Sequence, residues 1–489
     1  MSLLKPSNLH PYQVQAYKDI VRDKVFCITD DCGGGKTIIG LTAHVVIKRK
    51  RPKSIMLAVC KPSGVKGAWS NEYKKWSHTK DLKVAVLNGS PKQRLKLLKE
   101  QVHSVYAISY NSLGWLAEAM KEVDFDFDFV YGDEGDCLKG PDSQWRKDLI
   151  NCAPKAKFRI LASATPKAKE EDDYWGLCKY LDNGKCLNAS TVSEFRQQYC
   201  SSYTFKGRTI YTVKPSEIKK LESNIKHLFR NYGDKDAVKI PIKTICAYTN
   251  LSPSSLEKYE MLKTEACVNS IVFNNKGKID DSKSLDAMTL NGKLNELSSG
   301  FLYVDDNLRI TPEMLSKTTN VKQLIKKSKK RLAVDVFDDR KVALKKMIKT
   351  VRKRHGKIPL VICYNFKHEL TQLQEMLPNG VADTEENIEA RWNNDEIPYL
   401  FLQYNRSSKS LNLQYSSGYV LILYTSTYSW VDDYQIIRRL ARQGQKAKCV
   451  YAYRIMIRGT VDDAKATKLN SRFKGHKRFQ KQIIQEIFG

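Results

Sequence analysis

The sequence lacks the long apolar segments that membrane proteins require. Its apolar runs, of which 419–424 is an example, are far shorter than the ~20 residues of a membrane-spanning helix. The first residues, MSLLKPSNLHPYQ, contain no apolar region of the signal-peptide kind. These two absences favour a soluble protein of the cytoplasm or another reducing compartment.

Paired cysteines are also missing. The chain has 12 cysteines, but they form no CxxC motif and no cluster with histidine at metal-ligand spacing. Cys27, Cys60 and Cys363 lie inside apolar segments that are typical of buried strands. We interpret them as reduced core thiols, which excludes a disulfide-stabilised scaffold and a cysteine-bound metal.

Acidic residues are scarce relative to basic ones. The 489-residue chain has 53 Asp and Glu against 83 Lys and Arg, which gives a formal net charge of +30. Such a field attracts polyanions and speeds their encounter with the protein. A surface that is charged for solubility alone is the alternative, and membrane attachment would need a surface-binding arm or lipidation signal that is not evident. Nucleic acid is therefore the expected partner.

Short apolar runs alternate with helical stretches near both ends of the chain. The first group of candidate strands is 25–29, 54–59, 84–87, 105–109, 127–132 and 159–163. The second group is 359–364, 398–403, 419–424 and 449–455. This alternation is typical of βαβ units and predicts an α/β fold with parallel sheets. The length suits two domains of about 200 residues each, plus connections.

A glycine-rich segment, CITDDCGGGKTIIG at 27–40, lies between a predicted strand and a predicted helix. Backbone N–H groups and a helix N-terminus at such a junction form a cradle for phosphate. Lys36 would reach the β- and γ-phosphates, and the Thr37 hydroxyl would ligate Mg²⁺. Three glycines allow close approach of the backbone to phosphate: Gly33, Gly34 and Gly35. Taken alone, the segment is also compatible with a simple glycine-rich turn.

An acidic sequence ends the predicted strand in FDFVYGDEGD, 127–136. In a nucleotide hydrolase Asp133 would hold Mg²⁺, through water, and Glu134 would polarise the attacking water as general base. An acidic loop after a strand is the alternative interpretation. The phosphate-loop candidate upstream favours the catalytic one.

These motifs, in this order, resemble those of superfamily 2 helicases and, within them, the Swi/Snf-type DNA translocases. LHPYQ (9–13) is similar to the adenine-recognising element, which makes Gln13 the expected base contact. LASATP (161–166) resembles motif III, and the resemblance implies that Ser163 and Thr165 couple hydrolysis to movement. Further similar segments are 30–37, 61–76 and 108–113. DEGD departs from the family's DEAH at Gly135 and Asp136.

The resemblance continues toward the C-terminus. VICYNF (361–366) resembles motif IV, and SLNLQ (410–414) resembles the GLNLQ of motif V, with Ser410 replacing glycine. QIIRRLARQGQ (435–445) is similar to the family's QxxxRxxRxGQ. The resemblance implies that Arg439 and Arg442 are arginine fingers that reach the γ-phosphate across the cleft between two lobes. It also assigns Gln435 a coupling role.

The resemblance implies two RecA-like lobes with the ATP site in the cleft between them. We expect the first lobe at 1–215, insertions and the connection at 216–330, and the second lobe at 331–489 with a C-terminal helix at 479–488. ATP and Mg²⁺ are the implied cofactors, and duplex or branched DNA bound through its phosphates is the implied partner. The compact size favours a minimal, monomeric motor, of the kind expected of a phage.

Three functional hypotheses remain open. The first is an ATP-driven motor that moves along or remodels duplex, forked or branched DNA. The second is a strand-separating helicase that acts on single-stranded DNA tails or RNA, for which the segment 201–212 would supply a separating hairpin, unless it is only a surface hairpin. The third is a nucleic-acid-binding protein without ATPase activity, although Lys36, Asp133, Glu134 and Arg442 are all retained.

Overall fold

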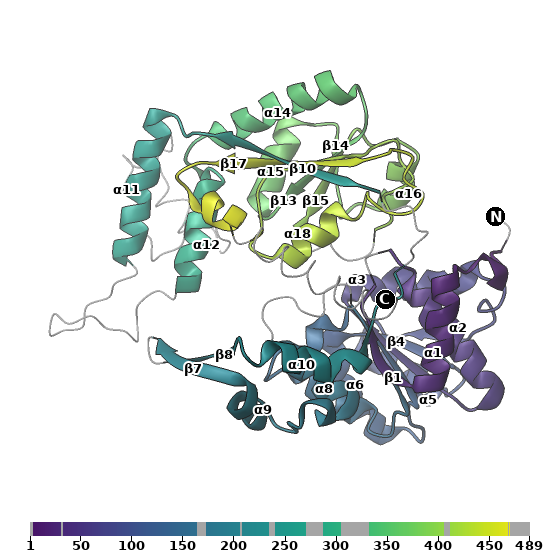
Figure 1. Cartoon of the computed structure of the whole chain (residues 1–489). Helices are drawn as coiled ribbons and strands as arrows, with labels where there is room; N and C mark the ends of the chain where they lie inside the picture. The colour runs from purple at the N-terminus through teal and green to yellow at the C-terminus, as the bar shows by residue number, and fades with distance from the viewer. Residues whose placement is uncertain are drawn as a thin grey trace. The chain divides into compact units, whose positions relative to one another are not determined.

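The computed structural model describes residues 3–30, 33–163, 173–205, 208–233, 240–269, 287–304, 332–404 and 411–467, together with Leu469. The chain forms two compact units (Figure 1), of which unit 1 covers 1–238 and unit 2 covers nearly all of 239–471. The predicted division into three segments, with boundaries at 215 and 330, stays a prediction. The predicted helix at 479–488 lies outside the described residues.

Unit 1 is built on a seven-stranded sheet in the order β3-β4-β2-β5-β6-β1-β9, and every pair of neighbours is parallel. The strands are β1 (Val25–Ile28), β2 (Met56–Cys60), β3 (Val84–Val86), β4 (Val105–Ser109), β5 (Phe129–Asp133), β6 (Phe158–Ala162) and β9 (Phe229–Arg230). The first six match the strands predicted from apolar runs. Parallel strands need crossover connections, and most of these connections contain helices.

The helices of unit 1 are α1 (Pro11–Asp23), α2 (Lys36–Lys50), α3 (Pro62–Lys66), α4 (Ala68–Asn71), α5 (Pro91–Lys99), α6 (Leu113–Ala119), α7 (Gln144–Cys152), α8 (Asp173–Asp182), α9 (Val192–Tyr199) and α10 (Ile218–Ile225). Local sequence fixes several of their starts. Helix α5 follows Ser90, whose hydroxyl accepts from the backbone of Gln93, and has proline as its first residue.

Two apolar cores lie on opposite faces of this sheet. In the fully buried strand β2, Leu57 and Val59 belong to one core, whereas Met56, Ala58 and Cys60 belong to the other. The alternation follows because successive side chains of a strand point to opposite faces. Helices α1 and α2 pack on one core and helices α6 to α8 on the other. Burial on both faces explains why these strands read as continuous apolar runs.

Unit 1 also carries a separate antiparallel hairpin, formed by β7 (Cys200–Phe205) and β8 (Arg208–Val213). It is a two-stranded sheet of its own and follows α9 in the chain. In Figure 1 it extends from the body of unit 1 next to α9. A hairpin at 201–212, which the sequence suggested, is therefore present.

Unit 2 contains a six-stranded sheet in the order β10-β17-β16-β13-β15-β14, again with parallel neighbours. The strands are β10 (Ile242–Thr249), β13 (Leu360–Tyr364), β14 (Gly380–Ala382), β15 (Tyr399–Gln403), β16 (Val420–Leu423) and β17 (Val450–Ile457). Strands β11 (Phe301–Val304) and β12 (Leu332–Asp335) form an antiparallel pair beside it. Both units thus have parallel sheets flanked by helices, and the predicted fold class is confirmed.

The helices of unit 2 are α11 (Pro253–Asn269), α12 (Ala287–Ser298), α14 (Asp339–His355), α15 (Lys367–Met376), α16 (Ile388–Asn393) and α18 (Trp430–Ile437). Helices α11 and α12 run side by side in Figure 1. Among the residues that the structure describes in the two units, no helix combines the length and the apolar character needed to cross a lipid bilayer.

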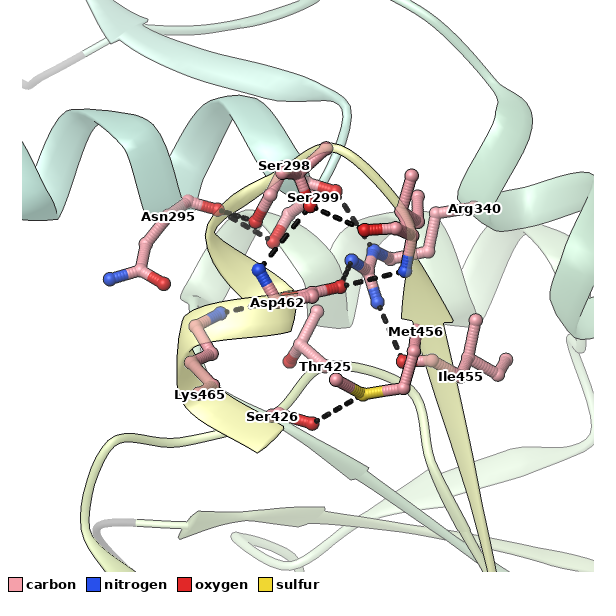
Figure 2. Close-up of polar contacts among 12 residues, drawn as sticks. Asn295, Ser298, Ser299, Arg340, Thr425, Ser426, Ile455, Met456, Asp462 and Lys465 are labelled. Atoms are coloured by element: carbon pink, nitrogen blue, oxygen red, sulfur yellow. Dashed lines mark hydrogen bonds and ion pairs between the residues drawn. The ribbon is translucent and has the colours of Figure 1, made fainter. Parts of the chain in front are cut away.

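A buried charged cluster holds several elements of unit 2 together (Figure 2). Arg340 of α14 donates to the carbonyl oxygens of Ser298, Tyr424 and Ile455 and forms an ion pair with Asp462. Lys465 approaches the other Asp462 oxygen at 3.1 Å. The three charged residues are 0–2% exposed. Burial alone would raise the pKa of Asp462, but Arg340 and Lys465 outweigh it and lower this pKa to about 2.

We predict that Asp462→Ala lowers the free energy of unfolding by about 3–5 kcal/mol, because it leaves the Arg340 guanidinium buried without its carboxylate. Because the folded pKa of Asp462 lies below its unfolded value, its contribution is fully present above pH 5 and is lost as pH falls from about 4 to about 2. Urea denaturation at several pH values measures both effects. The control is Asp463→Ala, which removes an exposed neighbour and should cost less than about 1 kcal/mol. Equal costs would show that the buried pair contributes nothing specific.

Candidate nucleotide site and arginine segment

The glycine-rich segment connects β1 to the N-terminus of α2, as the sequence predicted. Lys36 is the first residue of α2, and Gly35 precedes it with φ +68°. Gly33 also has a positive φ, +89°, which glycine adopts without steric cost. The N-terminus of α2 therefore presents backbone N–H groups after a tight turn, which is the arrangement that binds phosphate. Residues 31 and 32 lie outside the described ranges.

Gln13, the predicted adenine contact, packs directly on this turn. Its Nε2 donates to the Gly34 carbonyl at 3.3 Å, and its Oε1 accepts from the backbone N–H of His10 at 2.9 Å. The Tyr12 hydroxyl donates to the same Gly34 carbonyl at 3.0 Å. A Cβ on Gly35 would lie only 2.3 Å from Gln13 Nε2. Glycine at 35 is thus required both by its φ and by the approach of Gln13.

Lys36 is fixed relative to β5 by Tyr131. The Tyr131 hydroxyl donates to the Lys36 carbonyl at 2.6 Å, and its ring lies where a Cβ on Gly40 would clash, at 2.9 Å. The Lys36 Nζ donates to the Asp30 carbonyl at 2.9 Å. The first turn of α2 is therefore locked to the strand that ends at Asp133.

Asp133 is the last residue of β5 and its carboxylate is tightly held. One oxygen accepts from Trp69 Nε1 at 3.2 Å and the other from the Glu134 N–H at 3.1 Å. Tyr110 donates to the Asp133 carbonyl at 3.0 Å. Burial raises the pKa of Asp133, whereas the positive charge of Lys36 and the Trp69 hydrogen bond act in the opposite direction. The influence of Lys36 shows that the phosphate-loop lysine and this carboxylate share one electrostatic environment.

Glu134 adopts an unusual backbone conformation beside Asp133. Its φ is +54°, in the left-handed region that non-glycine residues seldom adopt. Its Oε2 lies 3.0 Å from Lys61 Nζ. Burial raises the pKa of Glu134, and Lys61 opposes that rise. Burial favours the neutral amine of Lys61, but the charges of Asp136 and Glu134 outweigh it and raise its pKa. The left-handed backbone conformation of Glu134 is strained, and strain of this kind often accompanies functional residues.

Ser163, the first predicted coupling residue, connects motif III to the acidic motif. Its hydroxyl donates to Asp136 Oδ1 at 3.4 Å, and its backbone N–H donates to Ile28 at the end of β1. Asp136, the departure from the family's DEAH pattern, thus contacts Ser163 directly. Thr165 lies outside the described residues, so its coupling role stays a prediction.

In unit 2 the arginine-rich segment begins in α18 and continues beyond its end. Gln435 of α18 and Arg439 after the helix are both buried. Arg442 donates from Nη1 to Asn412 Oδ1 at 2.9 Å and from Nε to the Arg438 carbonyl at 3.2 Å. Asn412 belongs to the predicted motif V, so motifs V and VI meet in this hydrogen bond. Ser410 of motif V lies outside the described residues.

Asn412 is itself held by Glu389 of α16. The backbone N–H of Asn412 donates to Glu389 Oε2 at 2.9 Å, and its Nδ2 lies 3.4 Å from Oε1. The Asn412 side chain is therefore oriented with its oxygen toward Arg442. Glu389, Asn412 and Arg442 form a chain of contacts that we call the arginine relay.

Helix α18 is anchored to the sheet of unit 2 by another buried pair. Arg454 of β17 donates to Asp433 of α18 at 2.7 Å and to Ser426 at 3.1 Å. Gln445, the last residue of QxxxRxxRxGQ, donates to the carbonyls of Gly418 and Leu440. Gln445 therefore helps to hold the segment that contains the arginines.

Several of these residues received no role from the sequence. Lys61 and Trp69 lie in a segment that resembles the family's motif of a Pro followed by a spaced Trp, Glu and Trp, and Asn412 lies in motif V, but none of them was given a role. Tyr131 and Glu389 gave no local signal. Their importance comes from contacts with residues that lie far away in the chain.

The candidate site fits a magnesium–nucleotide complex in its donor chemistry. Thr37 and Asp133 offer hard oxygen ligands, which Mg²⁺ prefers. Among the described residues no group of three or more His, Cys, Asp or Glu side chains is arranged to hold a metal ion. Mg²⁺ usually takes one or two protein carboxylates and completes its shell with water and phosphate.

Residues 22–309, more than half of the chain, match the family described as the SNF2-related domain. The chain belongs to the SNF2-related family. The resemblance to the Swi/Snf-like branch of superfamily 2, inferred from the motifs, is thereby confirmed, and membership implies an ATP-hydrolysing enzyme.

Family relatives include a phage protein of similar length. Putative protein p41 of Acyrthosiphon pisum secondary endosymbiont phage 1 is 24% identical, over 96% of this chain and 97% of that protein. The DNA repair and recombination protein RAD54-like of Gallus gallus is also 24% identical, over 89% of this chain, which spans 62% of the relative's length. The Sulfolobus solfataricus SWI2/SNF2 ATPase core in complex with dsDNA is 17% identical, with a TM-score of 0.42, over 95% of this chain and 92% of that one.

The arginine relay of this SNF2-related protein gives a first functional prediction. Asn412→Ala should lower the turnover number for ATP roughly tenfold and change KM little, because Arg442 loses an acceptor that orients it. Steady-state ATPase assays measure both constants. Asn393→Ala is the matched control, since Asn393 donates to the Asn412 backbone carbonyl at 2.7 Å and not to the arginine. If both variants lose turnover equally, Asn412 serves only the local fold.

Proposed function

We propose that the protein is an ATP-driven DNA translocase or helicase that moves along or remodels duplex, forked or branched DNA. The observation that carries the proposal is the joint placement of Lys36 at the N-terminus of α2 and of Asp133 and Glu134 at the end of β5. A hydrogen bond from Tyr131 of β5 to the Lys36 carbonyl joins the N-terminus of α2 to this strand. The net charge of +30 supports a polyanionic partner.

In this proposal the residues of unit 1 bind and activate the nucleotide. The N-terminus of α2 and Lys36 bind the phosphates, and Gln13 recognises the base. Thr37 and Asp133 would hold Mg²⁺, which supplies positive charge that balances the phosphates. Glu134 accepts a proton from the attacking water. Its burial raises its pKa, which strengthens it as a base, while Lys61 favours its ionised form.

Unit 2 would supply the arginines. We propose that Arg439 and Arg442 act on the γ-phosphate of the nucleotide bound by unit 1, so that transition-state charge is stabilised only when both units engage the nucleotide. Loss of the γ-phosphate removes these contacts and releases the engaged state. If each unit binds the DNA backbone, alternate binding moves a monomer along one strand. Such binding tolerates any sequence and weakens steeply with salt.

A strand-separating helicase is the second candidate, and one observation favours it. The hairpin β7–β8 provides a projecting element of the kind that separation requires. An ATP-independent binding protein is the remaining alternative, against which the retained Lys36, Asp133, Glu134 and Arg442 argue.

The proposal predicts a nucleic-acid-stimulated ATPase that depends on Lys36. Steady-state hydrolysis is measured without nucleic acid and with duplex DNA, single-stranded DNA, a four-way junction and RNA. We expect strong stimulation by duplex or junction DNA. Lys36→Ala should abolish turnover but leave nucleotide-free DNA affinity nearly unchanged, while Lys50→Ala, at the exposed end of the same helix, should retain both. Stimulation by single strands or RNA alone would favour the strand-separating helicase, and undiminished turnover in Lys36→Ala would overturn the site.

The role of Arg442 gives a second prediction. Arg442→Ala should leave ATP binding near normal and reduce hydrolysis by about 10³-fold, as expected for an arginine finger. Arg442→Lys should restore little, since lysine lacks the planar, multidentate guanidinium. Arg438→Ala is the control, because Arg438 lies over the Tyr434 ring in the same segment, 5.3 Å from its centre. Joint loss of ATP binding and of folding would instead identify Arg442 as a structural residue.

A further inference from the structure

The two faces of the hairpin β7–β8 differ in character. On the inner face Cys200 and Val213 form a cross-strand pair that is buried in the larger apolar core of unit 1. Tyr211 packs against the same core, and the Arg196 guanidinium of α9 lies 4.2 Å from its ring centre. The base of the hairpin is therefore rigidly attached to unit 1.

The outer face presents an apolar pair to solvent. Tyr203 and Ile210 lie directly opposite each other in the register and are 57% and 36% exposed. The next pair on this face, Ser201 and Thr212, is polar and exposed. A cross-strand contact between an aromatic and a β-branched residue stabilises a hairpin. That contact alone does not require the tyrosine ring to be more than half exposed.

The charge around the hairpin indicates what the outer face contacts. Between Glu194 and Glu217 the chain has no acidic residue, whereas it has four basic ones: Arg196, Lys206, Arg208 and Lys214. This excess of positive charge favours a polyanionic partner over an uncharged, apolar one. Basic residues interspersed with exposed aromatic rings are the combination that binds single-stranded nucleic acid, where phosphates pair with cations and bases stack on rings.

We propose that the outer face of β7–β8 is a binding surface for single-stranded DNA, with Tyr203 as the ring on which an unpaired base stacks. Ile210 supports that ring from the neighbouring strand, and the excess of positive charge in this stretch of the chain attracts the phosphates. The inference rests on the proposed function and adds to it, because it locates a contact with an unpaired strand, as at a fork. Stacking tolerates any base, which suits a motor that must pass over all sequences.

The test uses the full chain without nucleotide. Fluorescence anisotropy measures the binding of a forked DNA with one single-stranded arm and of a blunt duplex with the same paired sequence. We expect Tyr203→Ala to weaken binding of the fork about tenfold and of the blunt duplex less than twofold, and Tyr203→Phe to retain near-normal binding. The matched control is Thr204→Ala, one position along β7 on the opposite face, which should bind as the wild type does.

A second measurement covers the case in which Tyr203→Ala disrupts the hairpin. Tyr203→Thr keeps a strand-favouring residue, and a fork with 2-aminopurine at successive positions of the single-stranded arm reports stacking through its fluorescence. One position should respond to the wild type and to Tyr203→Phe but not to Tyr203→Thr. Equal affinity of the wild type, Tyr203→Ala and Tyr203→Thr for the fork, with no position that responds, would overturn the inference. Because no ATP is present, this outcome is independent of whether the ATPase proposal holds.

Discussion

Two partly buried carboxylates, Asp133 and Glu134, lie next to each other at the end of β5 and constrain the structure of unit 1. Removing an ionised carboxylate from water costs several kcal/mol unless charges or hydrogen bonds compensate. Asp133 receives hydrogen bonds from Trp69 and from the Glu134 N–H, and Glu134 pairs with Lys61. Lys36 adds its charge near Asp133. The phosphate-loop lysine thus favours the ionised form of Asp133 even without nucleotide.

The same charge balance explains why a metal ion belongs in this site. The negative charges of the two carboxylates and the positive charges of the two lysines nearly cancel. A bound polyphosphate brings further negative charge, which the backbone N–H groups of α2 offset only in part. In the proposed function, a divalent cation with Thr37 and Asp133 among its ligands would restore the balance. A need for Mg²⁺ would then follow from electrostatics as well as from the family's chemistry.

The sequence predicted the parts of this site that depend on local pattern. Apolar runs located most strands of both parallel sheets, because buried parallel strands are apolar on both faces. The glycines around Gly34 and the acids after Gly132 were recognisable because turn geometry and strand ends have local signatures. Tyr131 and Trp69 were not recognisable, since their hydrogen bonds join segments that only the sheet register brings together. Strand β10 was missed because it lies in a segment of loosened pattern, and β9 and β14 were missed because strands of two and three residues give no apolar run.

Three arginines of unit 2 differ in the partners that their side chains contact. Arg340 and Arg454 each pair with a buried carboxylate, which cancels their charge and fixes neighbouring elements. Arg442 donates to the amide oxygen of Asn412, and this hydrogen bond orients its guanidinium. All three are arginines within apolar or basic segments, so composition alone could not distinguish them.

The position of the hairpin in the chain follows from the constraints on the sheet. The strand ends that carry Asp133 and Ser163 tolerate little change, because each side chain has defined partners. The connection between β6 and β9 has more freedom, and loops of this kind accept additional elements that add a function. A surface that meets a DNA strand must also resist force from it. Burial of Cys200 and Val213 in the core of unit 1 makes the hairpin move with that unit, so any displacement of unit 1 along DNA would be transmitted to Tyr203.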